Sequence, residues 1–192
     1  MTETKAALRK ALRADRRRHV AALPDATRAL LFRVPPAPLK PMIGQMATIG
    51  LYRASANEAP AAAYARHFHE AGHPIGLPRF ADREAPMEFA LHTDPFGESD
   101  LQPGPFGLLQ PRADAERVVP DLLIVPLLGF TADGRRLGQG GGHYDRWLAA
   151  HPEAIAIGLA WDVQLVADLP HEPHDRPLAA VVTPTRLYGP FA

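Results

Sequence analysis

The chain has 192 residues, 46% of them hydrophobic, which suits one domain with a sizeable buried core. Its 21 lysines and arginines balance 21 aspartates and glutamates, so the composition excludes an overall field that would draw the protein onto nucleic acid or an anionic membrane. No cysteine is present, which excludes disulfides and thiolate zinc sites and fits a reducing cytoplasm.

The first part of the chain alternates helical and strand-like patterns. Residues 4–22 carry Leu8 and Leu12 near one helical face and arginines elsewhere, and residues 25–33 predict a second helix. Prolines between residues 35 and 41 end that helix, and the β-like run MATIGLY follows at residues 46–52. An alanine-rich helix is expected over residues 61–71. The N-terminal stretch lacks the apolar segment and cleavage site of a secretory signal, so we expect it to belong to the folded protein.

The rest of the chain continues the alternation. Strand patterns recur at residues 74–77, 87–91, 122–128, 154–159 and 179–182, and helical patterns at 144–150 and 163–169. The proline-rich stretch 84–120 is expected to form ordered, irregular connections. The longest apolar run, residues 122–130, is about half of a membrane span and indicates a buried strand. These patterns predict an α/β fold, a single domain over residues 1–192 with helix/sheet/helix layers and a largely parallel sheet.

Two segments are typical of ligand-binding loops, because ligands of such sheets bind beyond the carboxyl ends of strands. One is RASANEAP at residues 53–60, and the other is GRRLGQGGGHYDRW at residues 134–147. Glycines between a strand and a helix let backbone N–H groups approach a phosphate closely. The known nucleotide signatures do not match, since a dinucleotide fingerprint would need glycine at His143 and no Gly-Lys-Ser/Thr occurs. A flexible surface loop stays open as the alternative.

Asp145 extends the phosphate hypothesis to a metal ion. An aspartate in the first turn of a helix ordinarily stabilises the helix dipole, which is the alternative account. Beside a phosphate its charge would be repulsive unless a cation lay between them. Mg²⁺ commonly binds through one or two carboxylates plus substrate phosphates. A second carboxylate is therefore expected elsewhere in the chain.

The stretch HFHEAGHP contains the H-E-x-x-H spacing of zinc peptidases at His69, Glu70 and His73. That chemistry needs both histidines on one continuous helical face. Gly72 and Pro74 are expected to end the helix, so we interpret the match as a coincidence at a helix C-terminus.

The first predicted helix carries a cluster of arginines. With a neutral chain, a solvated helix face is the preferred interpretation, contact of a few of them with one anionic ligand is the intermediate one, and nucleic-acid binding is not favoured. The cluster comprises Arg9, Arg13, Arg16, Arg17 and Arg18.

The stretch VPLLGFTADGRRLGQGGGHYDRWL, residues 125–148, resembles the 5-formyltetrahydrofolate cyclo-ligase family, also called 5,10-methenyltetrahydrofolate synthetases. That family carries a proline, a short apolar step to phenylalanine and then R-L-G-x-G-x-G-Y-Y-D. This chain supplies Pro126, Phe130, Arg136, Leu137, Gly138, Gly140, Gly142, Tyr144 and Asp145. Four more segments are similar to the family: KAALR, LYRASANEAP, FGLLQP and IGLAWDVQLVADLPHEPHDRPLAAVVTP.

The resemblance implies a ligase that uses ATP and Mg²⁺ to convert 5-formyltetrahydrofolate to 5,10-methenyltetrahydrofolate, releasing ADP and phosphate after phosphorylation of the formyl oxygen. It implies Arg136 and Tyr144 as catalytic residues, and Asp145 and Asp175 as metal ligands. The implied ATP-binding residues are Lys5, Arg9, Arg136, Leu137, Gly138, Gln139, Gly140, Gly141, Gly142, His143 and Tyr144. The implied folate-binding residues are Arg53, Glu58, Gly140, Gly142, His143 and Tyr144.

Three positions depart from the usual pattern of the family. His143 stands where the first tyrosine is common, Thr131 where an aspartate is common, and Ala59 with Pro60 where "VDT" usually follows the glutamate. They fall at loops expected to contact the substrate, so they concern details of folate contact.

Alternative interpretations remain at two levels. Glu58 has a structural alternative as a glutamate near the start of the helix at residue 61, and Asp175 as a turn residue between prolines. The alternative for the whole chain is a non-catalytic nucleotide-binding regulatory module on the same fold. We expect a cytoplasmic monomer whose partners are ATP and the folate substrate, with no nucleic acid and no membrane.

Overall fold

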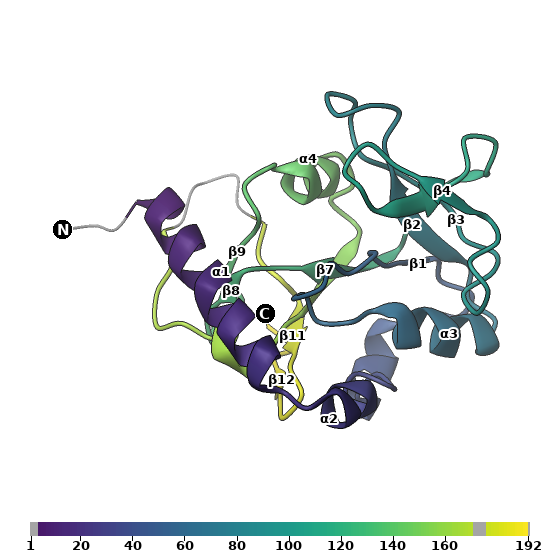
Figure 1. Ribbon diagram of the computed structural model, residues 1–192. Coiled ribbons are helices and arrows are strands. Elements are labelled where there is room, and N and C mark those ends of the chain that lie inside the picture. The colour runs from purple at the N-terminus through teal and green to yellow at the C-terminus, as the bar shows by residue number, and fades with distance from the viewer. Residues whose placement is uncertain (1–3, 171–175, 192) are drawn as a thin grey trace.

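A mixed sheet of eight strands forms the centre of the computed structural model, which describes residues 4–170 and 176–191 (Figure 1). The order across the sheet is β12-β11-β10-β7-β1-β2-β3-β6. The strands from β11 to β2 are parallel, while β12, β3 and β6 add antiparallel edges. The bounds are β1 Ile49–Gly50, β2 Ile75–Arg79, β3 Glu88–Leu91, β6 Arg117–Val118, β7 Leu122–Pro126, β10 Ile155–Leu159, β11 Ala180–Val182 and β12 Leu187–Tyr188. The predicted largely parallel sheet is confirmed.

Side chains of the central strand β7 alternate between two cores. Leu122 and Ile124 pack into the hydrophobic cluster on one face of the sheet, and Leu123 and Val125 pack into the cluster on the other. Successive strand residues point to opposite faces, so a strand covered on both sides is apolar throughout. This is the physical reason for the unbroken apolar run in the sequence.

Helices cover both faces of the sheet. In Figure 1, α3 (Ala62–Glu70) lies below the sheet and α4 (His143–Ala150) lies above it. Tyr64 and Phe68 of α3 and Trp147 and Leu148 of α4 are buried against the two cores. The predicted helix/sheet/helix layering is therefore confirmed. Shorter helices α2 (Asp25–Leu30) and the 3₁₀ helix η1 (Ala37–Met42) connect α1 to the sheet.

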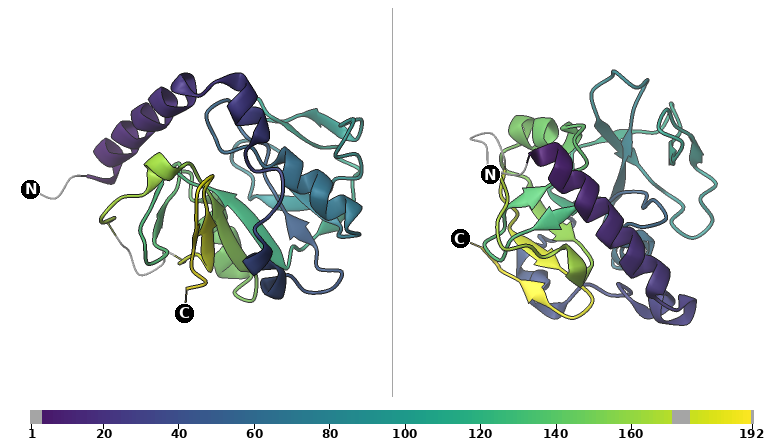
Figure 2. Two further views of the ribbon diagram at one scale, coloured as in Figure 1. Left: turned by 90° about the horizontal axis from the view of Figure 1, so that it is seen from below. Right: turned by 60° about the vertical axis from the view of Figure 1, so that its left-hand side comes forward.

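The long first helix, α1 (Lys5–Ala22), lies across a small hairpin at one end of the molecule (Figure 2). The hairpin consists of β8 (Gly129–Phe130) and β9 (Arg136–Leu137). Leu12 packs with Leu128 and Leu137 in a separate hydrophobic cluster. The Thr4 hydroxyl caps the helix by accepting a hydrogen bond of 3.3 Å from the Ala7 N–H. The helix therefore has a fixed position beside the segment that follows β7.

The two loops singled out in the sequence lie at one edge of the sheet. Strands β1 and β7 are parallel neighbours, with Ile49 opposite Leu122 and Gly50 opposite Leu123. Their carboxyl ends therefore point the same way, and the segments that follow both strands start side by side. The chain after β7 forms the β8–β9 hairpin, then the glycine loop of residues 138–142, then α4.

Several predicted elements differ from the structure. The expected helix over residues 163–169 is wrong: only the 3₁₀ turn η2 (Asp162–Gln164) forms. After this turn the chain runs extended beside β8, and the Val166 N–H donates a hydrogen bond to the Phe130 carbonyl at 2.9 Å. The helix expected over 25–33 ends at Leu30, and the strand expected over 46–52 is reduced to Ile49–Gly50.

The proline-rich stretch 84–120 contains more regular structure than predicted. Besides β3 and β6 it forms a hairpin of β4 (Leu101–Pro103) and β5 (Leu109–Pro111). Each of its two strands ends in a proline, a position that lies at the margin of the pairing and so tolerates the missing N–H.

The H-E-x-x-H match does not lie on one helical face. Helix α3 ends at Glu70, and the Nδ1 atom of His73 lies 2.9 Å from the Ala47 carbonyl oxygen. No helix in the described segments has the length and apolarity needed to cross a bilayer.

Candidate active site

A cavity of about 430 Å³ surrounds the glycine loop, and we call it the polar cavity because charged side chains and the loop backbone line it. It contains every residue that the sequence implicated in ATP binding, together with Pro126 and Asp145. The lining is Lys5, Arg9, Pro126, Arg136, Leu137, Gly138, Gln139, Gly140, Gly141, Gly142, His143, Tyr144 and Asp145. Residues of α1, β9, the loop and α4, far apart in the sequence, thus meet at one place.

Arginine side chains hold the carbonyl groups of this loop. The Arg9 Nε donates to the Gly138 carbonyl at 3.1 Å, the Arg13 Nη2 to the Gln139 carbonyl at 2.7 Å and the Arg146 Nη2 to the Gly141 carbonyl at 2.9 Å. The first two belong to α1 and the third to α4. The solvated-face interpretation of the α1 arginines is wrong for Arg16, which is buried. Arg9 and Arg13 are partly exposed, and both hold the loop through its carbonyl groups.

Two glycines of the loop have backbone angles that favour glycine. The φ angles of Gly140 and Gly142 are 107° and 63°. A Cβ atom on Gly142 would lie 2.8 Å from the Arg146 Nη1 atom, so a side chain there would disturb the arginine that holds the loop. Gly142 also precedes the first residue of α4, which directs the helix N-terminus toward the same cavity.

Arg136 and Asp145 form an ion pair within the polar cavity. The Arg136 side chain is only 4% exposed, whereas that of Asp145 is 30% exposed. The Nε atom of Arg136 is buried and has no hydrogen-bond partner among the described residues. A buried donor without a partner costs free energy.

The metal prediction concerned Asp145 and Asp175. Asp145 lines the polar cavity, but Asp175 lies outside the described residues. Within residues 4–170 and 176–191, no group of three or more histidine, aspartate and glutamate side chains could hold a metal ion.

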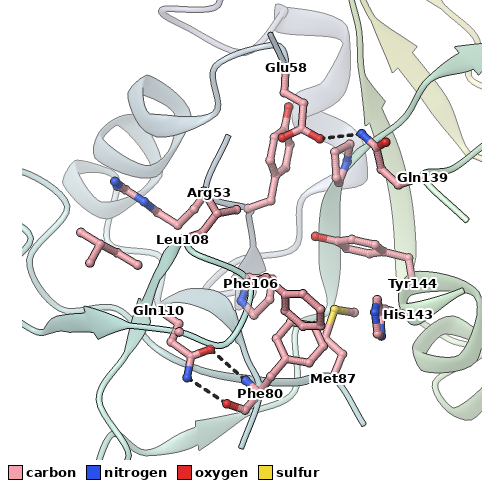
Figure 3. Close-up of a pocket in the computed structure, with 15 residues that line it drawn as sticks. Arg53, Glu58, Phe80, Met87, Phe106, Leu108, Gln110, Gln139, His143 and Tyr144 are labelled. Carbon is pink, nitrogen blue, oxygen red and sulfur yellow. Dashed lines mark hydrogen bonds between the residues drawn. The ribbon is translucent and has the colours of Figure 1, made fainter. Parts of the chain in front are cut away.

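A second, largely apolar cavity of about 260 Å³ adjoins the first (Figure 3). Rings from distant segments line it: Phe80 and Phe106 meet edge to face with centroids 4.9 Å apart, and Phe80 and His143 with centroids 5.0 Å apart. The full lining is Tyr52, Arg53, Glu58, Pro78, Phe80, Met87, Gly104, Phe106, Leu108, Leu109, Gln110, Pro126, Gln139, His143 and Tyr144. Such a cavity suits a flat, partly aromatic ligand.

The sequence prediction missed most of this apolar lining. Phe80 follows β2, and Phe106 and Leu108 lie on the β4–β5 turn, between strands whose pairing the sequence did not indicate. One signal was available, because FGLLQP at residues 106–111 was among the segments that resembled the cyclo-ligases.

Glu58 is held by three groups at the rim of the apolar cavity. Its Oε2 accepts from the Ser55 N–H at 2.8 Å, and its Oε1 accepts from the Gln139 Nε2 at 3.1 Å. The Arg16 Nη1 atom lies 3.9 Å from the same Oε1. Glu58 lies near the start of α3 but does not cap it, because the N-cap residue is Ala61 and no side-chain hydrogen bond caps the helix.

Arg53 lines the apolar cavity but forms an ion pair with Glu98. Both Nη atoms of Arg53 donate to the Glu98 carboxylate. Figure 3 shows its guanidinium group directed away from Glu58 and Tyr144. Two other residues of the predicted folate set, Gly140 and Gly142, line the polar cavity rather than the apolar one.

Four residues line both cavities: Pro126, Gln139, His143 and Tyr144. Burial raises the pKa of the Tyr144 phenol far above its usual value, with a further contribution from the negative charge of Glu58. Burial also lowers the pKa of His143, and the Arg146 charge lowers it further. The shared wall therefore combines a protonated phenol with a neutral imidazole.

The departures from the family pattern fall at different places. His143 lies at the shared wall. Thr131 is buried in the β8–β9 turn, outside both cavities, where its hydroxyl donates to Asp133 and accepts from the Arg135 N–H at 3.1 Å. Ala59 is also buried, and its carbonyl accepts from the Tyr52 hydroxyl.

The chain is similar in sequence to curated proteins of one family. It is 42% identical over 97 residues to the 5-formyltetrahydrofolate cyclo-ligase of Escherichia coli K12, a match that covers 47% of this chain and 53% of that protein. The corresponding protein of Mycolicibacterium smegmatis is 34% identical over 122 residues, covering 61% of this chain and 63% of its own. The matched segments thus span about half to three fifths of these curated relatives.

A solved structure supports the same relationship over the whole fold. The 5,10-methenyltetrahydrofolate synthetase of Aquifex aeolicus superimposes with a TM-score of 0.74 at 25% identity, over 97% of this chain and 92% of that one. The profile of the 5-formyltetrahydrofolate cyclo-ligase family matches residues 1–184. The resemblance seen in the glycine loop is confirmed: the chain belongs to the 5-formyltetrahydrofolate cyclo-ligase family.

Proposed function

We propose that this protein converts 5-formyltetrahydrofolate to 5,10-methenyltetrahydrofolate, with ATP converted to ADP and phosphate. The observation that carries the proposal is the pair of adjoining cavities with a common wall. One is polar, with cationic side chains around a glycine loop, and the other is apolar with a carboxylate at its rim. A reaction between a nucleoside triphosphate and a reduced folate needs a phosphate site next to a pterin site, because the γ-phosphoryl group must reach the formyl oxygen.

The chemistry accounts for the need for ATP. The formyl group on N5 is a poor electrophile, because the nitrogen donates electrons into the carbonyl. Transfer of the γ-phosphoryl group to the formyl oxygen releases ADP and turns that oxygen into a leaving group. N10 then attacks the formyl carbon and loses its proton, and the C–O bond breaks to release phosphate and leave the methenyl bridge. Catalysis of this kind rests on positioning and charge neutralisation.

The polar cavity is proposed to bind ATP. Lys5, Arg9 and Arg136 supply positive charge, and Arg136 also has a buried Nε that lacks a partner among the described residues. The arginines that hold the loop engage its carbonyl oxygens. That orientation is suited to presenting the loop N–H groups to phosphate oxygens.

The apolar cavity is proposed to bind the folate. Phe80 and Phe106 offer ring faces and edges to the pterin, and the Glu58 carboxylate matches its ring N–H and amino donors. Tyr144 lies between the two ligands in this arrangement. Because its phenol stays protonated, it can donate a hydrogen bond where negative charge develops on the transferred group.

Mg²⁺ is proposed to bind with the nucleotide. Asp145 faces the polar cavity with a partly exposed carboxylate, and carboxylate plus phosphate oxygens is a donor set that Mg²⁺ prefers. Asp145 would hold the ion, and the resemblance to the family implies Asp175 as a second ligand. The ion would neutralise phosphate charge.

A direct assay tests the proposed activity. Purified protein is mixed with 5-formyltetrahydrofolate, ATP and Mg²⁺, and the conjugated methenyl product is followed by absorbance, with ATP omitted as the control. Product that forms only with ATP supports the enzyme. Nucleotide binding by calorimetry without any product or folate binding would instead favour a regulatory module.

Sedimentation of the same sample tests the proposed monomeric state. The proposed cytoplasmic location rests on composition.

A further inference from the structure

Gln139 joins the two cavities through a single side chain. It lines both of them, and its Nε2 donates to the Glu58 Oε1 atom at 3.1 Å (Figure 3). Its Oε1 accepts from the Arg13 Nε at 3.2 Å, and its backbone carbonyl accepts from the Arg13 Nη2 at 2.7 Å. Both ends of the amide are therefore occupied, one by a residue of the apolar rim and one by a helix that holds the glycine loop.

The position of Gln139 depends on the conformation of the loop. Its neighbours are glycines, Gly138 and Gly140, and Gly140 has a φ angle of 107°. Arg9 and Arg13 hold the carbonyl groups of Gly138 and Gln139, but the wide φ and ψ range of the flanking glycines lets the loop N–H groups adjust to a ligand. A ligand that binds the loop amides restricts this freedom and fixes where the Gln139 amide points.

Glu58 does not rely on Gln139 alone. The Ser55 N–H and Arg16 hold it from segments other than the loop. Without the Gln139 amide, the Ser55 N–H still holds Oε2 and Arg16 still supplies a counter-charge 3.9 Å from Oε1, but Oε1 loses its hydrogen-bond donor. The contribution specific to Gln139 is the link between Glu58 and the loop that surrounds the polar cavity.

We propose that Gln139 couples the binding of nucleotide to the binding of folate, so that each ligand strengthens the binding of the other. The proposal rests on the function proposed above. Nucleotide on the loop fixes the Gln139 amide, the amide fixes one oxygen of Glu58, and the folate meets a carboxylate that is already oriented. Thermodynamic linkage makes the effect reciprocal. A hydrogen bond to a charged group is large enough to give a coupling of about tenfold in affinity.

The experiment measures folate affinity by calorimetry with and without a saturating non-hydrolysable β,γ-imido analogue of ATP, in the presence of Mg²⁺. The test variant is Gln139→Met, which keeps the length of the side chain but removes its hydrogen bonds. The matched control is Leu108→Ala, because Leu108 lines the apolar cavity and is 41% exposed on the β4–β5 turn, away from the loop. Thermal unfolding confirms that each variant is folded.

The wild-type protein is expected to bind 5-formyltetrahydrofolate about tenfold more tightly when the analogue is present. In Gln139→Met the ratio is expected to fall close to one, while in Leu108→Ala both affinities fall and the ratio is retained. A wild-type ratio in Gln139→Met overturns the coupling, as does a ratio of one in a wild-type protein that binds both ligands. Absence of folate binding to the wild-type protein overturns the proposed function itself, which separates the two failures.

Discussion

The guanidinium group of Arg16 lies 3.9 Å from the carboxylate of Glu58, and both side chains are buried, with 7% and 10% exposed. Burial lowers the pKa of Arg16, and the charge of Glu58 partly offsets that effect. Arg16 Nη1 also lies 3.4 Å from the Leu127 carbonyl oxygen. A helix face expected to be solvated thus supplies the counter-charge for the carboxylate that we assign to the folate.

Replacement of Arg16 by methionine is expected to destabilise the protein by about 3 kcal/mol, because the Glu58 carboxylate is left largely buried without its counter-charge. Urea unfolding at neutral pH measures the effect. The double variant Arg16→Met, Glu58→Gln should recover part of the loss, since its buried pair carries no charge. Equal losses in the single and double variants would show that Arg16 acts through packing instead.

Gly140→Val is expected to weaken nucleotide binding about 30-fold, equivalent to about 2 kcal/mol of backbone strain. A β-branched residue does not readily adopt the φ angle of 107°, and the loop must change shape to admit it. Gly138→Ala is the matched control, because its φ angle is not in the left-handed region and a Cβ there would lie 3.6 Å from Arg136 Nη1. Calorimetric titration with the ATP analogue compares them. Similar losses in both variants would contradict an account based on φ.

Asp145→Asn is expected to raise the Mg²⁺ concentration needed for half-maximal rate by about tenfold, because a neutral amide binds the ion more weakly than a carboxylate. The initial rate is measured across a Mg²⁺ titration at saturating ATP. Asp175→Asn, which tests the prediction made from the sequence alone, should shift the same curve. An unchanged midpoint in either variant would remove that residue from the proposed metal site.

His143 is expected to make the protein less stable below neutral pH. Burial and Arg146 lower its folded-state pKa, so the unfolded chain binds the proton more readily, and stability falls as the pH drops through about 6.5 and below. His143→Phe keeps a ring against Phe80 and Phe106 but cannot titrate. Its free energy of unfolding should fall less between pH 7 and pH 5 than that of the wild-type protein. Parallel curves for the two proteins would show that His143 does not contribute.

The sequence predicted those features that depend on local pattern. The apolar run of β7, the glycine loop and the start of α4 near residue 144 all follow from residues close together in the chain. The fold class and the family were likewise predicted correctly. These features combine short-range periodicity with a long motif, which is the information that one sequence carries best.

Features that depend on distant partners were not predicted. The burial of Arg16 requires Glu58 and Leu127, and the place of Phe106 requires the β4–β5 hairpin to turn toward Phe80. The expected helix over residues 163–169 failed for a similar reason, since backbone pairing with β8 competes with local helical propensity. The hydrophobic periodicity of one segment does not reveal which residues from distant parts of the chain will contact it.

Two hydrogen bonds from α1 to the glycine loop connect segments that are far apart in the chain. Arg9 donates to the carbonyl of Gly138, 129 residues away, and Arg13 donates to the carbonyl of Gln139, 126 residues away. Contacts between residues so far apart in the chain require a long loop to close, which costs conformational entropy. A nucleotide that binds only where these contacts exist stabilises the finished fold over partly folded chains. We therefore expect ATP to raise both the yield of refolding and the melting temperature. The cellular ATP concentration would then affect the amount of folded protein in the cell.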